Sequence, residues 1–139
     1  MKHESMQLLS IARKARLIEA GEEPVGAACR AQHGRLVLVA ADASPHTVRR
    51  VQSFVVGTAQ PWIRLDCGKD ELGAAIGAPA CAVAAITDVR LALAFAKTLE
   101  PAEQYAGLLE DLSRRSERVE QRRKEEKAHR TNVRKGKKK

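Results

Sequence analysis

The feature that most constrains this chain is an unbroken apolar run at residues 36–40, read LVLVA. The run is short and rich in branched side chains, which is typical of a strand covered on both faces inside a sheet. A similar run at 82–86 ends, like the first, shortly before an aspartate: Asp42 in one case and Asp88 in the other. Each aspartate can cap a helix that follows. The sequence therefore predicts two strand-to-helix units around which the rest of the chain packs.

Helical stripes and shorter apolar runs alternate along the chain. A first helix is expected at 5–15, with Leu8, Ile11, Ala12 and Ala15 on its buried face. The other expected elements are an edge strand at 17–20, helices at 22–32 and 44–57, a strand at 61–65, and helices at 69–76 and 88–98. This alternation predicts an α/β fold, a three-layer α/β/α sandwich with a small mixed sheet.

Beyond the sandwich we expect a C-terminal helix and a basic tail. Residues 1–99 are assigned to the α/β/α domain, 100–121 to an amphipathic helix, and 122–139 to a basic tail that is disordered on its own. The amphipathic helix carries a stripe formed by Tyr105, Leu108, Leu109, Leu112 and Val119. Because the stripes of the sandwich are expected to end by Thr98, residues 1–98 should fold without the rest.

The positive charge lies at one end of the chain. The net charge is +8, with 25 Lys or Arg against 17 Asp or Glu. Residues 113–139 hold 13 of the basic residues and 4 of the acids, for a net +9, so residues 1–112 carry 12 and 13, for a net −1. A near-neutral body with a basic end indicates that the chain meets nucleic acid or another anionic surface through that end.

The cysteines favour a reduced, cytoplasmic protein. Cys29, Cys67 and Cys81 are odd in number and widely spaced, which supports neither a disulfide framework nor a zinc site. No apolar run reaches the ~18 residues of a membrane span, and no signal-type segment follows Met1. We expect no metal, no cofactor and no membrane partner.

Candidate catalytic residues are scattered. The four histidines are isolated, and capping accounts for Asp42 and Asp88 without any chemistry. Trp62 and Tyr105 stand in apolar patterns, where packing is a more common role than stacking on bases. The sequence therefore favours a protein that is not an enzyme.

The last ten residues, RTNVRKGKKK, hold six basic residues and no acid, and phosphate is the natural partner of such a segment. RNA is favoured over a membrane because no apolar face accompanies the charge. Residues 113–127 carry interleaved glutamates and equally fit a solvated helix that binds nothing. The RNA-binding residues expected in the tail are Arg130, Arg134, Lys135, Lys137, Lys138 and Lys139.

Four blocks of the sequence, LLSIARKARLIEAGEE, GRLVLVAADAS, DELGAAIG and AVAAITD, occur in an order that resembles one known superfamily. It is that of ribosomal proteins L-seven-Ae and L-thirty-e, and the resemblance is greatest to its bacterial YlxQ-type branch, over about residues 5–98. The resemblance implies an α/β/α sandwich that binds RNA, commonly at kink-turns.

The resemblance also implies where RNA would be contacted. Of the family's Gly-x-Asn-Glu-x-x-Lys motif only Gly21 is kept, and Glu23, Pro24 and Ala27 stand at the other places. Glu19 and Glu22 add negative charge to the same surface, so kink-turn recognition of the family type is predicted to be weak. The implied contacts of the domain are Gly21, Arg30, and the loop residues Ala78, Pro79 and Ala80.

Two functions follow from these observations. The first is a monomeric, ribosomal or ribosome-associated RNA-binding protein in which the tail supplies affinity and the domain supplies contacts that depend on RNA shape. The second is a protein-interaction module, in which the surface near Gly21 and the helix at 105–119 dock onto a partner such as a ribosomal protein.

Overall fold

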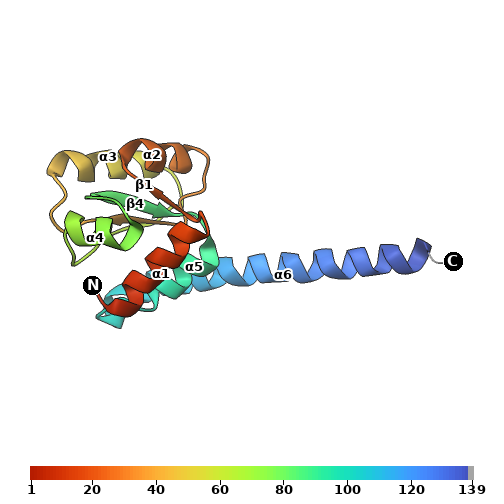
Figure 1. The fold of residues 1–139 in the computed structure, drawn as a ribbon. Helices are drawn as coiled ribbons and strands as arrows, with labels where there is room; N and C mark the ends of the chain where they lie inside the picture. The colour runs from red at the N-terminus through yellow and green to blue at the C-terminus, as the bar shows by residue number, and fades with distance from the viewer. Residues whose placement is uncertain (138–139) are drawn as a thin grey trace.

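A four-stranded mixed sheet forms the middle layer of the molecule (Figure 1). The computed structural model describes residues 1–137, with side chains described for residues 1–133. The strands are β1 (Ile18–Ala20), β2 (Leu36–Val39), β3 (Trp62–Arg64) and β4 (Val83–Ile86). Their order in the sheet is β1-β4-β2-β3. β4 is antiparallel to both of its neighbours and β2 is parallel to β3, so the two apolar runs form the two inner strands, as expected.

Helices cover both faces of the sheet. α2 (Glu22–Arg30) and α3 (Pro45–Val55) lie on one face, and α1 (His3–Lys14), α4 (Lys69–Ile76) and α5 (Val89–Ala96) lie on the other (Figure 1). A 3₁₀ turn, η1 (Ala102–Tyr105), leads into the long helix α6 (Ala106–Lys137). This is the predicted α/β/α sandwich, and the expected strands and sandwich helices are confirmed to within a few residues at their ends.

Each inner strand contributes side chains to two hydrophobic clusters, because its side chains alternate between the two faces of the sheet. Leu36 and Leu38 of β2 join the larger cluster with α1, α4 and α5, whereas Val37 and Val39 join a smaller cluster with α2 and α3. All four side chains are fully buried. The continuous apolar run is thus explained by burial on both faces.

The buried face of α1 differs from the expected stripe. Ser5, Leu9 and Ala12 face the core, while Ala15 is exposed and 53% of Ile11 is accessible to solvent. Ser5 is buried because its hydroxyl forms a 2.6 Å hydrogen bond with the hydroxyl of Thr98. A search for apolar spacing does not find a buried serine. The expected and the observed buried faces of α1 therefore point in different directions around the helix.

Asp42 caps a helix other than the one that follows it. Its carboxylate accepts a 2.8 Å hydrogen bond from the backbone N–H of Lys69, at the start of α4. α3 is instead capped by Ser44, which accepts from the N–H of Thr47 at 3.2 Å. Asp88 caps α5 as expected, accepting from Leu91 N–H at 2.9 Å. The expected cap is confirmed for Asp88, whereas the prediction that Asp42 caps the helix that follows it is wrong, because Ser44 caps that helix.

α6 contributes to the core, against the expectation that the core ends by Thr98. Leu112 is fully buried in the cluster that holds Leu9 and Phe95, and Leu108, Leu109 and Val119 pack against it. The apolar stripe of the amphipathic helix is therefore correctly located, but it covers the sandwich. The apolar contacts of the sandwich therefore extend to Val119.

The residues expected to form a disordered tail continue α6 as one helix to Lys137 (Figure 1). Every side chain from Gln121 to Val133 is exposed, so no core contact holds this part. Its helical form instead follows from local preferences. The segment has no proline and is rich in Glu, Gln, Lys and Arg, and pairs such as Gln121 with Glu125 bond at i, i+4 spacing. Lys138 and Lys139 lie outside the described residues.

Candidate nucleic-acid interface

α2 begins at the end of the sheet where β2 finishes, and Gly21 shapes this start. The φ angle of Gly21 is 95°, in the region that favours glycine. Its N–H donates to Val83 O at 2.9 Å, which holds it beside β4, and its carbonyl accepts from Val25 N–H at 3.1 Å. No side chain caps the helix. The first amides of α2 therefore form an electropositive helix start, from which the N–H at Pro24 is missing.

The loop before β4 lies at the same end as Gly21, as the sequence implied. Cys81 follows the loop, and its thiol donates to the carbonyl of Val83, the residue that pairs with Gly21. The loop rests directly on α4, since Ala78 N–H donates to Gly73 O at 2.8 Å. A Cβ at Gly73 would stand 2.7 Å from Ala78 O and 2.9 Å from Ala80 Cα. Gly21 and Cys81, the residue that follows the loop, both bond to Val83 O, so Gly21 and the loop lie at the same end of the sheet; we call Gly21 and Ala78–Ala80 the Gly21 surface.

The acids of this surface are not equivalent. The Glu22 carboxylate accepts a 2.9 Å hydrogen bond from Thr47 Oγ1 and lies 3.2 Å from Arg50 Nε. The Arg50 contact is an ion pair by distance, but its angle does not make a hydrogen bond, and the guanidinium also stacks 5.5 Å from the Phe54 ring. Glu22 therefore joins α2 to α3, and its charge is offset by Arg50. This corrects the view of Glu22 as a free acid facing RNA.

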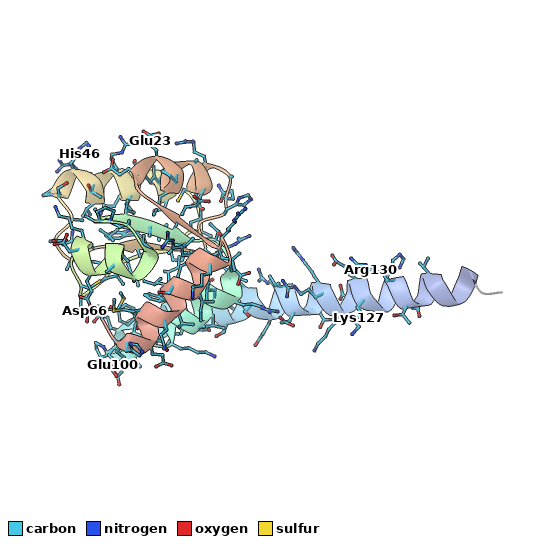
Figure 2. The ribbon with its side chains drawn as sticks, in the orientation of Figure 1. Glu23, His46, Asp66, Glu100, Lys127 and Arg130 are labelled. Atoms are coloured by element: carbon cyan, nitrogen blue, oxygen red, sulfur yellow. The ribbon has the colours of Figure 1, made fainter. Side chains whose placement is uncertain are left out.

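Glu19 and Glu23 are exposed, as the sequence analysis assumed. Figure 2 shows Glu23 on the outer surface of α2, at the same side of the molecule as His46 of α3. These two acids remain free to repel phosphate at the Gly21 surface.

The backbone of Arg30 lies away from the Gly21 surface. Arg30 is the last residue of α2, so nine residues of helix, or about 13 Å, separate it from Gly21. Its Nη1 lies 3.3 Å from the position of a Cβ on Gly26, which shows that the side chain lies back along the helix. Arg30 therefore forms part of the α2–α3 side of the molecule.

The basic part of α6 leaves the domain at the opposite end of the sheet. Arg115 Nη2 donates to Ala59 O at 2.7 Å, just before β3, and Arg90 pairs with Glu120. From there the helix projects away from the domain, and Lys127 and Arg130 lie far from Glu23 and His46 (Figure 2). The predicted RNA-binding residues thus fall on the Gly21 surface, on the α2–α3 side where Arg30 lies, and on α6. Arg134, Lys135 and Lys137 belong to α6, although their side chains lie outside the described part.

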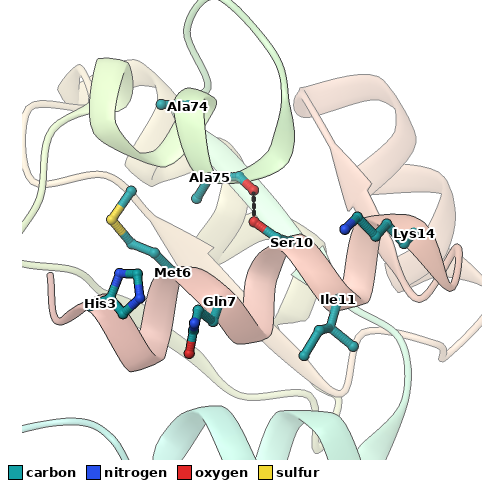
Figure 3. Close-up of a pocket in the computed structure, with 8 residues that line it drawn as sticks. All are labelled: His3, Met6, Gln7, Ser10, Ile11, Lys14, Ala74 and Ala75. Atoms are coloured by element: carbon teal, nitrogen blue, oxygen red, sulfur yellow. Dashed lines mark hydrogen bonds between the residues drawn. The ribbon is translucent and has the colours of Figure 1, made fainter.

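An open groove of about 510 Å³ lies between α1 and α4 (Figure 3). Ser10 Oγ donates to Ala75 O at 2.9 Å across its floor. Ile11 stands at its rim and also borders a second groove of about 320 Å³ toward α5. This surface was not expected from the sequence, because the apolar spacing of α1 placed Ile11 in the core.

The three cysteines are free and buried. Burial raises the pKa of each thiol. The thiols therefore stay protonated near neutral pH and are weak nucleophiles. Within residues 1–137 no group of three or more His, Cys, Asp or Glu side chains is arranged to hold a metal ion.

Among the described helices, including the 32-residue α6, none is long and apolar enough to span a membrane.

No protein-family model and no curated protein matches this sequence. Solved structures do match it. One is a protein of unknown function from Bacillus halodurans, with a TM-score of 0.60 and 26% identity, over 68% of this chain and 98% of that one. Another is the 15.5kD RNA binding protein of Giardia lamblia, with a TM-score of 0.58 and 23% identity, over 78% of this chain and 87% of that one. The sandwich is thus shared with known proteins, one of which is named for binding RNA.

Proposed function

We propose that this chain is a non-catalytic RNA-binding protein, ribosomal or ribosome-associated, of the L-seven-Ae and L-thirty-e type. The observation that carries the proposal is the shared fold with the Giardia lamblia RNA binding protein, at a TM-score of 0.58 over 78% of the chain. The four sequence blocks that resemble the same superfamily point to the same activity, and the net +9 of residues 113–139 supplies a partner for phosphate.

In this proposal RNA is bound through two surfaces with different tasks. The basic part of α6, including Arg130, provides affinity that does not depend on RNA sequence. The Gly21 surface provides contacts that depend on shape, through the backbone of Gly21 and of the loop Ala78–Ala80. The protein acts as a cytoplasmic monomer without a cofactor.

Selective recognition of kink-turns is not part of the proposal. Pro24 removes a backbone donor from the first turn of α2, and Glu23 is an exposed acid beside the remaining donors. The family's base-reading side chains are replaced by Glu23, Pro24 and Ala27. What remains is a backbone shape set by Gly21, with little side-chain chemistry to read a base.

A non-catalytic role agrees with the chemistry of the reactive groups. The carboxylates of Asp42 and Asp88 bond to helix N–H groups, so both are engaged in capping. The cysteine thiols are buried and protonated, as described above. The two carboxylates that were candidates for catalysis thus have structural tasks.

Fluorescence anisotropy with labelled RNAs tests the proposal. The full chain would be titrated with a kink-turn RNA, a duplex of equal length and charge, and a single strand, at several salt concentrations. We expect binding to all three, with weak preference for the kink-turn and affinity that falls steeply with salt. Absence of binding at low salt would contradict RNA binding, and strong kink-turn preference would contradict only the weak-selectivity part.

A second function, docking of a protein partner, is favoured by one observation. Ile11 is half exposed between two grooves on α1, whereas the stripe at 105–119 that the sequence offered for docking is packed on the sandwich. Sedimentation with purified ribosomes separates the two functions. Loss of association in Ile11→Asp with unchanged RNA affinity would favour protein docking, while unchanged association would exclude it.

A further inference from the structure

Three arginines from two distant parts of the chain meet where α6 leaves the domain. Arg35, just before β2, and Arg115 and Arg118 of α6 line a hollow of about 340 Å³. Gln32, Ala59 and Gln60 complete its walls, and no acidic side chain lines it. The hollow lies at the opposite end of the sheet from the Gly21 surface, since Arg35 N–H bonds Ile86 O at the end of β4.

The walls of this hollow are held by internal hydrogen bonds. Arg115 donates to Ala59 O at 2.7 Å, and its Nε lies 3.2 Å from the Asp111 carboxylate. The buried Gln60 side chain accepts from Gly34 N–H at 2.8 Å and donates to Cys29 O at 2.9 Å. These bonds connect the starts of β2 and β3, the end of α2, and α6. The shape of the hollow is therefore fixed by the fold.

Two of the three guanidinium groups carry uncompensated charge. Neither Arg35 nor Arg118 forms an ion pair with a described side chain, whereas the charge of Arg115 is offset by Asp111. Planar guanidinium groups match the geometry of phosphate oxygens and bind them in a bidentate way. A concave surface that holds two free guanidinium groups and no acid favours a phosphate ligand.

We propose that this hollow binds a backbone phosphate of the RNA and anchors it at the root of α6. RNA is favoured over a free phosphate because the hollow continues into the basic helix. Arg115, Arg118 and Arg122 follow one another at spacings of three and four, on one side of α6, so a strand held at the hollow can continue along the helix. The inference rests on the proposed RNA binding, and it adds a site remote from the Gly21 surface.

The test compares two double variants of the full chain. Arg35→Gln with Arg118→Gln removes both free guanidinium groups and leaves Arg115 in place. Arg49→Gln with Lys97→Gln is the matched control, because both residues are exposed, lie outside the hollow and lose the same charge. Circular dichroism melts would establish that all the proteins are folded.

The expected result is specific to the hollow. With a duplex RNA near 0.1 M salt, we expect the Arg35→Gln/Arg118→Gln chain to lose about tenfold or more in affinity. Its log-log salt slope should become shallower by about 1, since the one phosphate contact that is lost contributes about 0.9. The control should change affinity by less than about twofold.

Other outcomes would overturn the inference in distinguishable ways. If the wild type binds RNA and both double variants behave alike, the hollow is not a contact and the proposed function stands. If the wild type does not bind RNA, both proposals are wrong. If inorganic phosphate stabilises the wild type but not the Arg35→Gln/Arg118→Gln chain, with equal RNA affinities, the hollow binds a free phosphate and the RNA assignment is wrong.

Discussion

Single residues decide how the Gly21 surface is built. Gly21 supplies a left-handed backbone angle that an ordinary side chain would strain, and Gly73 lets the loop Ala78–Ala80 rest on α4. Glu22 connects α2 to Thr47 and Arg50 of α3. The Gly21 surface is therefore supported by the packing of residues that RNA need not contact.

Gly73→Ala should destabilise the protein by about 1–2 kcal/mol. The new methyl group would meet Ala78 O at 2.7 Å, and such overpacking costs about 1–3 kcal/mol, less the gain in helix propensity of up to about 1 kcal/mol. Gly107→Ala in α6 is the matched control, because nothing lies within 4 Å of its added Cβ. Urea unfolding measures both, and equal stabilities of the two variants would contradict the close contact.

Introducing the Gly-x-Asn-Glu-x-x-Lys motif of the superfamily that the sequence resembles should create kink-turn preference. Glu23→Asn, Pro24→Glu and Ala27→Lys together change the net charge by only +1, so a large gain must come from geometry. We expect about 1–3 kcal/mol of preference for a kink-turn over a duplex, the usual scale for polar readout of bases. Anisotropy titrations measure it. Submicromolar, selective kink-turn binding by the wild type without residues 122–139 would show that the backbone of Gly21 suffices.

The buried thiols should make stability depend on alkaline pH. Burial raises the folded-state pKa of Cys29, Cys67 and Cys81, so their contribution is complete below the unfolded pKa of about 8.5 and is lost as pH rises through the folded pKa. Urea unfolding between about pH 7 and pH 10 measures this loss. Replacing all three cysteines by alanine should reduce the slope, and an unchanged slope would assign it to other groups.

Among the elements, α6 has two parts that are stabilised by different interactions. Its first four turns bury Leu112 against the sandwich, whereas the turns beyond Gln121 touch nothing. Tertiary packing stabilises the first part, and the second depends on local propensity and charge pairs.

Leu112→Ala should lower the free energy of unfolding by about 2–5 kcal/mol, the usual cost of a cavity at a fully buried leucine. Val133→Ala, on the free part of the same helix and 42% exposed, should change it by less than about 0.5 kcal/mol. Chemical unfolding of both variants gives the comparison, and a mild effect at Leu112 would indicate that α6 only rests on the sandwich.

For the same reason, a chain ending at Thr98 should be unfolded or molten, whereas a chain ending at Gln121 should melt cooperatively near the temperature of the full chain. The shorter chain exposes the core that Leu112 covers, and that loss is a large share of a typical stability of 5–15 kcal/mol. Calorimetry distinguishes the two, and a cooperative transition in the shorter chain would restore residues 1–98 as an independent unit.

At the scale of the whole molecule, the positive charge and the Gly21 surface lie in different parts. The body carries a net −1 and the end of the chain a net +9, and α6 carries that charge away from the Gly21 surface (Figure 1). Surfaces so far apart are expected to contribute to binding independently.

Deleting residues 130–139 should flatten the salt dependence of RNA binding. About four to six phosphate contacts would give the full chain a log-log slope of about −4 to −5, and the deletion removes six basic residues. Glu125→Gln with Glu126→Gln should instead tighten binding by removing repulsion. Anisotropy against salt concentration measures both, and unchanged affinity and slope after the deletion would exclude this segment from binding.

The sequence by itself determined what depends on near neighbours. Apolar runs, helical stripes and Asp88 predicted the strands, the helices and the cap of α5, because periodicity and capping act within one or two turns. The concentration of positive charge in residues 113–139 was also evident from the sequence, since it requires only a count of charged residues.

Tertiary structure decided what joins distant residues. Asp42 caps α4 across 27 positions, Ser5 is buried by Thr98, and Leu112 completes a core begun by Leu9. The hollow between Arg35 and Arg118 joins residues 83 positions apart, and the opposite placement of α6 and Gly21 depends on the direction of every strand. Such contacts form only when the whole chain has packed. The free energy of burial favours any pair of residues that fills the available space, so no local sequence pattern identifies which residue will be the partner.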